Sequence, residues 1–193
     1  MNWFKKISQE ASALDSHLEY FNELSDYGDY TPKPEDIYDN LGDQSIVDFV
    51  GEGDSGQAYR LDDGSILKIT TNNREGKISD WLRINPHPNI VRYDRVWQSG
   101  DLYYIKMENI DATLPPNIFH LISLMEKLLL QKKCTSPDCA IKIFSNMRVL
   151  KRTPFFNDII SYLNHIKKLN PYDFFNKNNI GIKDGKLKFF DIN

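Results

Sequence analysis

The sequence predicts an α+β fold in which a five-stranded antiparallel sheet with one helix precedes a reduced, mainly helical part. Short apolar runs separated by turn residues fill 46–109, and runs with helical periodicity fill 117–169. A chain of 193 residues, 40% of them hydrophobic, is long enough for a compact body with two subdomains. We expect a helical extension over 1–44, a sheet domain over 45–110 and a helical domain over 111–193.

The N-terminal stretch carries an apolar stripe. Its hydrophobic side chains recur at spacings of three and four, as on one face of a helix: Phe4, Ile7, Ala11, Leu14, Leu18 and Phe21. A helix over 2–24 with this stripe needs a partner surface, which is either the chain's own body or another protein. A linker over 26–34, punctuated by glycine and proline, and a short helix over 34–41 are expected next.

The pattern changes to β at residue 46. Asp63-Gly64 separates two apolar runs and favours a hairpin, because this dipeptide tolerates the positive φ angles of a tight turn. A helix over 73–84 interrupts the sheet, and Ser99-Gly100-Asp101 joins the last two runs. The predicted strands are 46–50, 58–61, 65–69, 90–97 and 102–107.

Helices dominate the rest of the chain. Pro115-Pro116 precedes Asn117, which we expect to be the N-cap of a helix over 118–133. Two further helices are expected over 140–151 and 155–169. The chain closes with a predicted hairpin, whose strands 179–182 and 187–190 flank a Lys183-Asp184-Gly185 turn.

Charge is distributed unevenly along the chain. Residues 1–43 hold ten acids against three lysines, a net of −7, whereas residues 150–193 hold eight bases against four acids, a net of +4. This asymmetry indicates either that the acidic N-terminal stretch docks on the basic C-terminal stretch of the same chain, or that both sets of charges simply face the solvent. The formal charge of −3 and the lack of a dense Arg/Lys stripe argue against nucleic-acid binding.

No stretch approaches the roughly 18 consecutive apolar residues of a membrane span. We therefore expect no membrane partner and a cytoplasmic location, in the host cytoplasm if the protein is viral. Cys134 and Cys139 lack a second cysteine pair or a nearby histidine that would complete a zinc tetrad. We expect both to be reduced thiols in a loop.

A glycine-rich turn, Gly51-Glu52-Gly53-Asp54-Ser55-Gly56, is the first motif with a chemical meaning. In a dinucleotide-binding fold such a motif opens a helix, but here it joins two predicted strands. Lys68 lies in the strand after the next turn, and Glu75 is the single glutamate of the helix that follows. Downstream, Asp173, Asn178 and Asp191 are separated by intervals of 5 and 13 residues.

These motifs occur in the order and spacing of the protein-kinase-like superfamily, which the sequence resembles over about 46–193. Pro86-His87-Pro88-Asn89-Ile90-Val91 is similar to the H-P-N-I-V that leads into the family's fourth strand. The run from Leu102 to Glu108 is similar to the L-Y-x-V-M-E that ends the fifth. The resemblance implies a five-stranded N-lobe, a reduced helical C-lobe and a Mg-ATP site between them.

The resemblance also implies individual roles. The residues implied to bind ATP are Gly51, Glu52, Gly53, Asp54, Ser55, Gly56, Ala58, Lys68, Glu75, Met107, Glu108 and Ile110. Among them, Lys68 would bind the α and β phosphates and pair with Glu75, with Asp80 as the alternative partner. Ala58 would face adenine, Met107 would be the gatekeeper, and the backbone of Glu108 and Ile110 would bind adenine.

The implied catalytic and metal residues lie near the end of the chain. Asp173 would orient the acceptor hydroxyl and take its proton, while Asn178 and Asp191 would hold Mg²⁺ against the β and γ phosphates. Asn179 competes with Asn178, because Asn179-Ile180-Gly181 resembles the N-I-G of bacterial and phage small-molecule kinases.

Several positions depart from the family pattern. Pro171-Tyr172 stands where the family has H-R before the catalytic aspartate, and Asp191-Ile192-Asn193 stands for D-F-G. Phe175 replaces a lysine that contacts the γ phosphate, unless Lys177 substitutes for it. From the resemblance we expect the family's activation segment and final helices to be missing, because Asp191 lies only two residues before Asn193.

The expected function is that of an ATP-dependent phosphotransferase acting on a hydroxyl, with protein Ser/Thr as the first acceptor and a small molecule as the alternative. A pseudokinase, acting as an ATP-binding interaction module through its N-terminal helix, is the rival class. The length fits either a minimal kinase of viral or phage type or a truncated one. We also expect the N-terminal helix, the helix over 140–151 or both to pack beneath the catalytic loop.

Overall fold

The structure is a computed structural model that describes residues 40–53, 56–169, 171 and 173–192. The first of two compact units comprises the described residues up to Gly76 together with Arg95–Lys106. The second comprises Lys77–Asp94 and the described residues from Met107 onward. The predicted helix over 2–24 and the predicted linker lie outside the described residues, as does the short helix apart from its last two residues.

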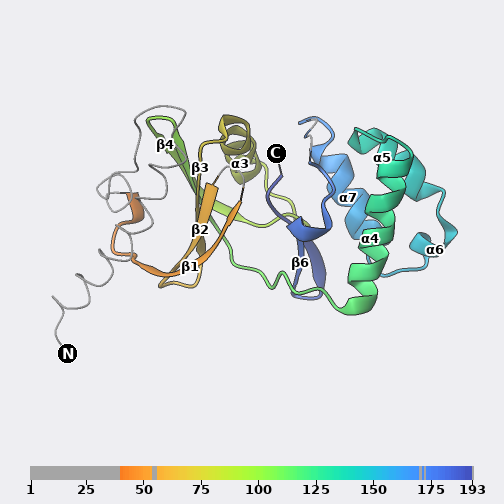
Figure 1. The fold of residues 1–193 in the computed structure, drawn as a ribbon, viewed down its shortest axis with the longest axis horizontal. Helices are drawn as coiled ribbons and strands as arrows, with labels where there is room; N and C mark the ends of the chain where they lie inside the picture. Colours follow the sequence, from red (N-terminus) through yellow and green to blue (C-terminus); the bar gives the residue numbers. More distant parts are fainter. Residues whose placement is uncertain (1–39, 54–55, 170, 172, 193) are drawn as a thin grey trace. The chain divides into compact units, whose positions relative to one another are not determined.

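The first unit is organised around a five-stranded antiparallel sheet in the order β1-β2-β3-β5-β4. Figure 1 labels β1, β2, β3 and β4 of this sheet. The strands are β1 (Ile46–Gly53), β2 (Gly56–Leu61), β3 (Ile66–Thr70), β4 (Tyr93–Ser99) and β5 (Leu102–Met107). The β2–β3 connection is the predicted hairpin, in which Gly64 has a φ of 81° and Asp63 Oδ1 accepts a hydrogen bond from the Ser65 N–H at 2.9 Å.

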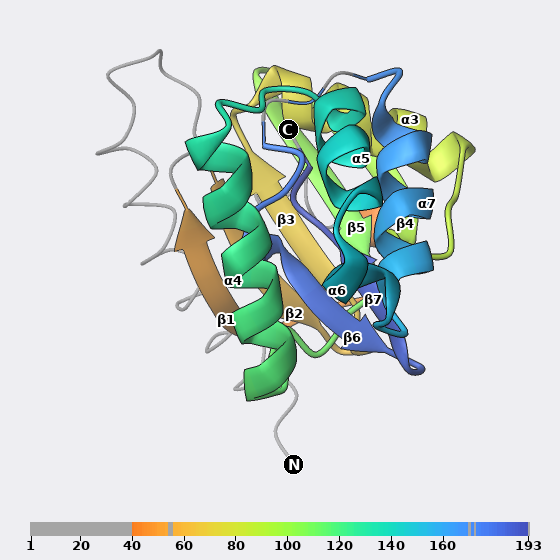
Figure 2. The same ribbon diagram turned by 90° about the vertical axis from the view of Figure 1, so that its right-hand side faces the viewer.

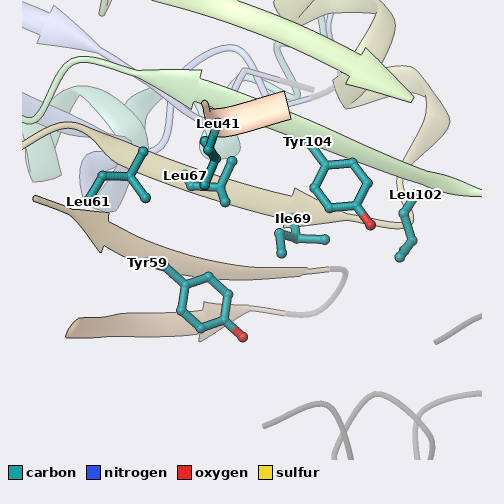
Figure 3. Close-up of a cluster of buried hydrophobic side chains, with 7 residues drawn as sticks. All are labelled: Leu41, Tyr59, Leu61, Leu67, Ile69, Leu102 and Tyr104. Atoms are coloured by element: carbon teal, nitrogen blue, oxygen red, sulfur yellow. The ribbon is translucent and has the colours of Figure 1, made fainter. Parts of the chain in front are cut away.

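One face of this sheet carries the core of the first unit. Alternate residues of three strands point into it, since successive side chains of a strand face opposite sides. Figure 3 shows the cluster: Leu41, Tyr59, Leu61, Leu67, Ile69, Leu102 and Tyr104. Trp97 stacks on Tyr104 with ring centroids 5.2 Å apart. Leu67 and Ile69 point into this core. The side chain between them, Lys68, therefore projects from the opposite face of β3.

Helix α3 (Asn73–Ile84) follows β3 with the bounds predicted from the sequence. Asn72 caps it, because Asn72 Oδ1 accepts hydrogen bonds from the N–H groups of Arg74 at 3.1 Å and Glu75 at 3.2 Å. The cap so close to the end of β3 puts Glu75 in the first turn of the helix.

The second unit contains four further α-helices, α4 (Pro116–Gln131), α5 (Pro137–Ser145), α6 (Arg148–Lys151) and α7 (Phe156–Ile166). Helices α5 and α7 lie side by side (Figure 2). Helix α7 buries one apolar face consisting of Ile159, Tyr162, Leu163 and Ile166. The Tyr162 ring stacks on Phe189 at 3.6 Å between centroids, and its hydroxyl donates to the Phe174 carbonyl at 2.6 Å. Tyr162 thus fixes both the final hairpin and the segment that precedes it.

That hairpin pairs β6 (Ile180–Lys183) with β7 (Lys186–Phe189) and follows a short 3-10 helix, η1 (Lys177–Asn179). The Ile182 N–H donates to the Asp111 carbonyl at 3.0 Å, and the Val91 N–H donates to the Phe189 carbonyl at 3.0 Å. Neighbouring backbone therefore borders both of its strands.

The structure corrects three details of the helical region. Asn117 is not the N-cap of α4, because the helix begins at Pro116, where the fixed φ of proline suits a first helical position. The helix expected over 140–151 is divided, since α5 ends at Ser145 and α6 begins at Arg148. Helix α5 also starts early because the Ser136 hydroxyl caps it, accepting a hydrogen bond from the Cys139 N–H at 3.3 Å.

The expectation of reduced thiols is wrong. Cys134 and Cys139 form a disulfide, with Cα atoms 5.7 Å apart, well within the range that a disulfide spans. The strand predicted over 90–97 begins later, at Tyr93, because Ile90 instead forms a bridge with Phe189. Within the described part of the chain, no helix is both long and apolar enough to cross a membrane.

Candidate functional site

The glycine-rich turn lies between two paired strands. Gly51 pairs with Ala58 and Gly53 with Gly56, while Asp54 and Ser55 fall outside the described residues. A β-carbon on Gly56 would stand 2.3 Å from the carbonyl oxygen of Ile69, so the strand pairing itself requires a glycine there.

Gly51 and Gly53 differ from Gly56. A β-carbon on either would meet no described atom within 4 Å, so the packing of the described residues does not demand a glycine at these two positions. Close approach of a ligand to bare backbone is the other common reason for glycine in a strand. Gly51 is half-buried and Gly53 is exposed, so this stretch of β1 backbone is partly accessible.

Lys68 and Glu75 form the ion pair expected from the sequence. Lys68 Nζ lies 2.5 Å from Glu75 Oε1, and the two side chains are 15% and 3% exposed. Asp80, the alternative partner, instead binds Arg83 at 2.9 Å on the surface of α3. A buried carboxylate of this kind is stable only when it is paired and hydrogen-bonded.

The second oxygen of Glu75 is also bound. Thr70 Oγ1, at the end of β3, donates a hydrogen bond to Glu75 Oε2 at 3.0 Å. The same hydroxyl accepts a hydrogen bond from the Asn72 N–H at 3.1 Å. Thr70 therefore connects the strand, the helix cap and the carboxylate.

In the second unit, the segment that follows β5, called the connector below, is held in place by the side chain of Glu108. Glu108 Oε1 accepts hydrogen bonds from the Arg92 N–H at 2.8 Å and from Lys188 Nζ at 3.0 Å. Glu108 Oε2 lies 2.7 Å from Lys183 Nζ. Burial opposes ionisation of this carboxyl, but the hydrogen bonds from Lys183, Arg92 and Lys188 prevail and lower its pKa to about 2.

The hydrogen bonds to the Glu108 side chain do not use the backbone groups of this connector, which can therefore bind a ligand. Among the described residues, no hydrogen bond is found to the Glu108 carbonyl or from the Ile110 N–H. Gly181 permits the close approach of the hairpin, because a β-carbon there would stand 2.5 Å from the Asp111 carbonyl oxygen. Met107 is the last residue of β5 and is partly buried.

Asp173 lies in the segment before η1. Its Oδ2 accepts a hydrogen bond from Asn176 Nδ2 at 3.0 Å. Asn176 Oδ1 in turn accepts from the Asn178 N–H at 3.0 Å and so caps η1. The aspartate is therefore oriented by a side chain that also starts the 3-10 helix.

Asn178 and Asn179, the two candidate metal ligands from the sequence, have different surroundings. Asn178 is exposed, whereas Asn179 Nδ2 donates a hydrogen bond to the Asp191 carbonyl at 3.1 Å. The Phe190 N–H donates to the Asn179 carbonyl at 3.0 Å, so these residues meet at the open end of the β6–β7 hairpin. This geometry favours Asn179 as the neighbour of Asp191.

Asp191 adopts a left-handed backbone conformation with a φ of 52°. Asp184 has a similar φ because it lies in the hairpin turn, but Asp191 lies in no such turn. Non-glycine residues in this region cost free energy and are concentrated at functional sites.

The structure accounts for the contacts of Phe175, which departs from the family pattern, and of Lys177, its possible substitute. Phe175 is buried and contacts Phe144 and Phe189, at centroid distances of 5.4 Å and 6.1 Å. Lys177 Nζ binds Glu126 Oε2 of α4 at 2.9 Å. Phe175 is thus part of the hydrophobic core, and Lys177 is paired with the carboxylate of Glu126.

Comparisons with known proteins add little to this geometry. No protein-family model and no curated protein matches the sequence. A solved structure described as "Crystal structure of Rad53 1-466 in complex with AMP-PNP" is similar with a TM-score of 0.49 and 19% identity. The match covers 80% of this chain and 39% of that chain, so the chain spans well under half the length of that structure.

Sequence reasoning identified the ion pair but missed the residues that orient it. Thr70 and Asn72 carry no motif, although an asparagine three residues before Glu75 is a recognisable helix-start signal. It also missed Lys183 and Lys188 as partners of Glu108. The sequence placed Lys183 in the hairpin turn and Lys188 in the last strand, with no signal for a partner of either.

Proposed function

We propose that this protein is an ATP-dependent phosphotransferase with a protein-kinase-like fold, which transfers the γ-phosphoryl group of Mg-ATP to a hydroxyl. The observation that carries the proposal is the buried Lys68–Glu75 ion pair, formed between a strand and the helix that follows it. A lysine held by a carboxylate at 2.5 Å keeps its ammonium in a fixed place, where phosphate oxygens can bind it.

The glycine-rich turn supports the same function. Gly51 and Gly53 present accessible backbone without a packing reason to be glycine, as a phosphate-covering loop requires. Glu108 and Ile110 carry the backbone groups that would bind an adenine edge, and the Glu108 side chain holds that connector in place.

The end of the chain supplies oxygen ligands that suit magnesium. Mg²⁺ prefers hard oxygen donors and commonly takes only one or two protein carboxylates, with water and phosphate completing the shell. The amide oxygen of Asn179 and the carboxylate of Asp191 fit this preference. The described residues contain no cluster of three His, Cys, Asp or Glu, as a site completed by protein ligands alone would have. When bound, the ion would neutralise charge on the β and γ phosphates.

The protein's own groups have distinct tasks in this proposal. Lys68 binds phosphate oxygens and stabilises charge as the terminal phosphoryl group leaves ADP. Asp173 accepts a hydrogen bond from the acceptor hydroxyl, aligns its oxygen with phosphorus and receives its proton as the new O–P bond forms. The Asn176 amide holds the Asp173 carboxylate in one orientation.

The acceptor is proposed by class. Protein Ser/Thr hydroxyls are the first choice, and a small-molecule hydroxyl is the alternative, because Phe175 replaces a lysine of the protein-kinase pattern. A partner protein at the predicted N-terminal helix is also part of the proposal.

A second candidate is a pseudokinase that binds nucleotide without transferring phosphate. It is favoured by the ion pair of Lys177 with Glu126 and by the burial of Phe175, since neither side chain is placed as a γ-phosphate ligand. Retention of Asp173, Asn179 and Asp191 favours the enzyme, because a scaffold has no chemical need for all three.

The melting temperature tests nucleotide binding directly. It is measured with ATP and Mg²⁺, with ATP and a chelator, and without ligand. Ligand at 100 times its Kd adds about 2.7 kcal/mol, which raises the melting temperature of a chain this size by roughly 5 to 10 °C. Absence of any shift in every condition would overturn the proposal.

Matched variants then separate the roles. Asp191→Ala and Asn179→Ala are expected to lose the Mg²⁺-dependent part of the shift, whereas Asn178→Ala keeps it. Asp173→Asn is expected to abolish phosphate transfer while leaving ATP affinity largely intact. Nucleotide binding in the wild type without transfer to any peptide or small-molecule hydroxyl supports the pseudokinase instead.

A further inference from the structure

The Lys68–Glu75 pair is built within a short segment of one unit. Only seven positions separate the two residues in sequence, and both oxygens of the carboxylate are used. Lys68 binds Oε1 at 2.5 Å, and the Thr70 hydroxyl binds Oε2 at 3.0 Å. The orientation of Glu75 is therefore determined by two groups of β3.

Glu75 occupies a position at which glutamate often has a different task. Asn72 is the N-cap of α3, so Glu75 is the third helical residue. In a capping box a glutamate at this position turns back to accept a hydrogen bond from the N–H of the cap residue. A Glu75 side chain in that conformation would point away from Lys68.

Thr70 removes the reason for that turn. The Asn72 N–H donates to Thr70 Oγ1 at 3.1 Å, which satisfies the group that a capping-box glutamate would serve. The hydroxyl proton remains for Glu75 Oε2. Thr70 is fully buried, so water does not compete for either bond.

We propose that Thr70 is a positioning residue for the candidate phosphate site: its hydroxyl occupies the Asn72 N–H and holds the Glu75 carboxylate toward Lys68. Groups of β3 and of the first turn of α3 then orient the pair. The link to phosphate rests on the proposed function, whereas the orientation of Glu75 does not.

The first test needs no nucleotide. The rate at which an acylating reagent modifies Lys68 is measured by mass spectrometry in the full chain, because an ammonium held by a carboxylate reacts slowly. Thr70→Val keeps the shape of the side chain and removes the hydroxyl, and Thr70→Ser keeps the hydroxyl. Thr71→Val, on the exposed neighbour, is the matched control, and Glu75→Gln gives the rate for a broken pair.

We expect Thr70→Val to accelerate Lys68 modification several-fold, toward the rate of Glu75→Gln, while Thr70→Ser and Thr71→Val stay at the wild-type rate. A wild-type rate in Thr70→Val would overturn the proposal. If valine prevents folding, Thr70→Ala and Thr70→Ser are compared, since they differ by one oxygen atom. Equal rates in that pair also overturn it.

A second measurement tests whether the Thr70 hydroxyl affects nucleotide binding. If the wild type binds Mg-ATP, Thr70→Val is expected to weaken Mg-ATP several-fold and to leave adenosine affinity unchanged. If the wild type binds no nucleotide, the proposed function fails, but the acylation rates still decide whether Thr70 orients Glu75.

Discussion

Gly76 lies directly against the ring of Tyr103: a β-carbon on Gly76 would stand 2.1 Å from two of the ring atoms. The Tyr103 hydroxyl donates a hydrogen bond to Asn73 Oδ1 at 3.1 Å, in the same turn of α3. The first turn of the helix is therefore seated on β5. Because Glu75 precedes Gly76, this contact sets the position from which its carboxylate reaches Lys68.

Gly76→Ala is accordingly expected to destabilise the protein. The tyrosine ring is largely buried and cannot move aside freely, and overpacking of this kind costs roughly 1–3 kcal/mol. Chemical denaturation measures the change in unfolding free energy.

Gly51→Ala is the matched control, because a β-carbon there meets no described atom within 4 Å. It should leave the unfolding free energy nearly unchanged, and under the proposed function it should weaken Mg-ATP binding. Equal stability of the two alanine variants would contradict the contact between Gly76 and Tyr103.

The sheet was predictable because local signals agree with the tertiary fold. Asp63-Gly64 forms the turn that its chemistry favours, and α3 has the bounds read from the sequence. The five strands differ from the predicted ones only at their ends. Even the early position of Glu75 follows from sequence, since Asn72 is a strong N-cap residue.

The residues that complete the candidate site were less predictable, because their roles depend on contacts distant in sequence. Glu108 meets Lys183 and Lys188 across 75 and 80 positions, and no local pattern encodes such a pairing. Which of Asn178 and Asn179 lies next to Asp191 depends on where η1 ends and β6 begins. A one-residue boundary of this kind is the least certain part of any prediction from sequence.

Glu108→Gln is expected to destabilise the second unit. The change leaves Lys183 and Lys188 near one another without the carboxylate between them, and the Glu108 side chain is only 7% exposed. Breaking a buried pair on one side costs up to about 3–5 kcal/mol, and the partial exposure of Lys183 reduces this to roughly 2 kcal/mol.

The control for this variant is Glu126→Gln. Glu126 is more exposed than Glu108, at 19% against 7%, and it pairs with Lys177, which is 35% exposed; pairs of this kind contribute about 1 kcal/mol or less. Denaturation of both variants at neutral pH gives the comparison. If Glu108→Gln loses no more stability than Glu126→Gln, the bonds of Glu108 to Lys183 and Lys188 contribute no more to the unfolding free energy than the pair at Glu126.

His87 predicts a pH dependence of stability. Its Nδ1 accepts a hydrogen bond from the Asn89 N–H at 3.2 Å, and its Nε2 lies 3.0 Å from the Ser161 hydroxyl. The His165 ring lies 4.6 Å away between centroids. Burial, His165 and Lys188 together lower the pKa of His87 from 6.5 to about 4, and Asp158 opposes them only in part.

The sign follows from proton binding in the two states. Between pH 6.5 and 4 the unfolded chain binds a proton at His87 that the folded chain does not, so the unfolding free energy falls as pH decreases through this interval.

His87→Asn should flatten this part of the profile of unfolding free energy against pH, because the amide oxygen can still accept from Asn89 but does not titrate. His120→Asn, at an exposed histidine of α4, should leave the profile unchanged. The pKa of Glu108 is lowered from 4.5 to about 2, so its contribution is lost mainly below pH 4.5, and the slope between pH 6.5 and 4.5 reports on His87. An unaltered slope in His87→Asn would mean that the ring is protonated in the folded protein, in which case the Asn89 N–H cannot be bonded to Nδ1.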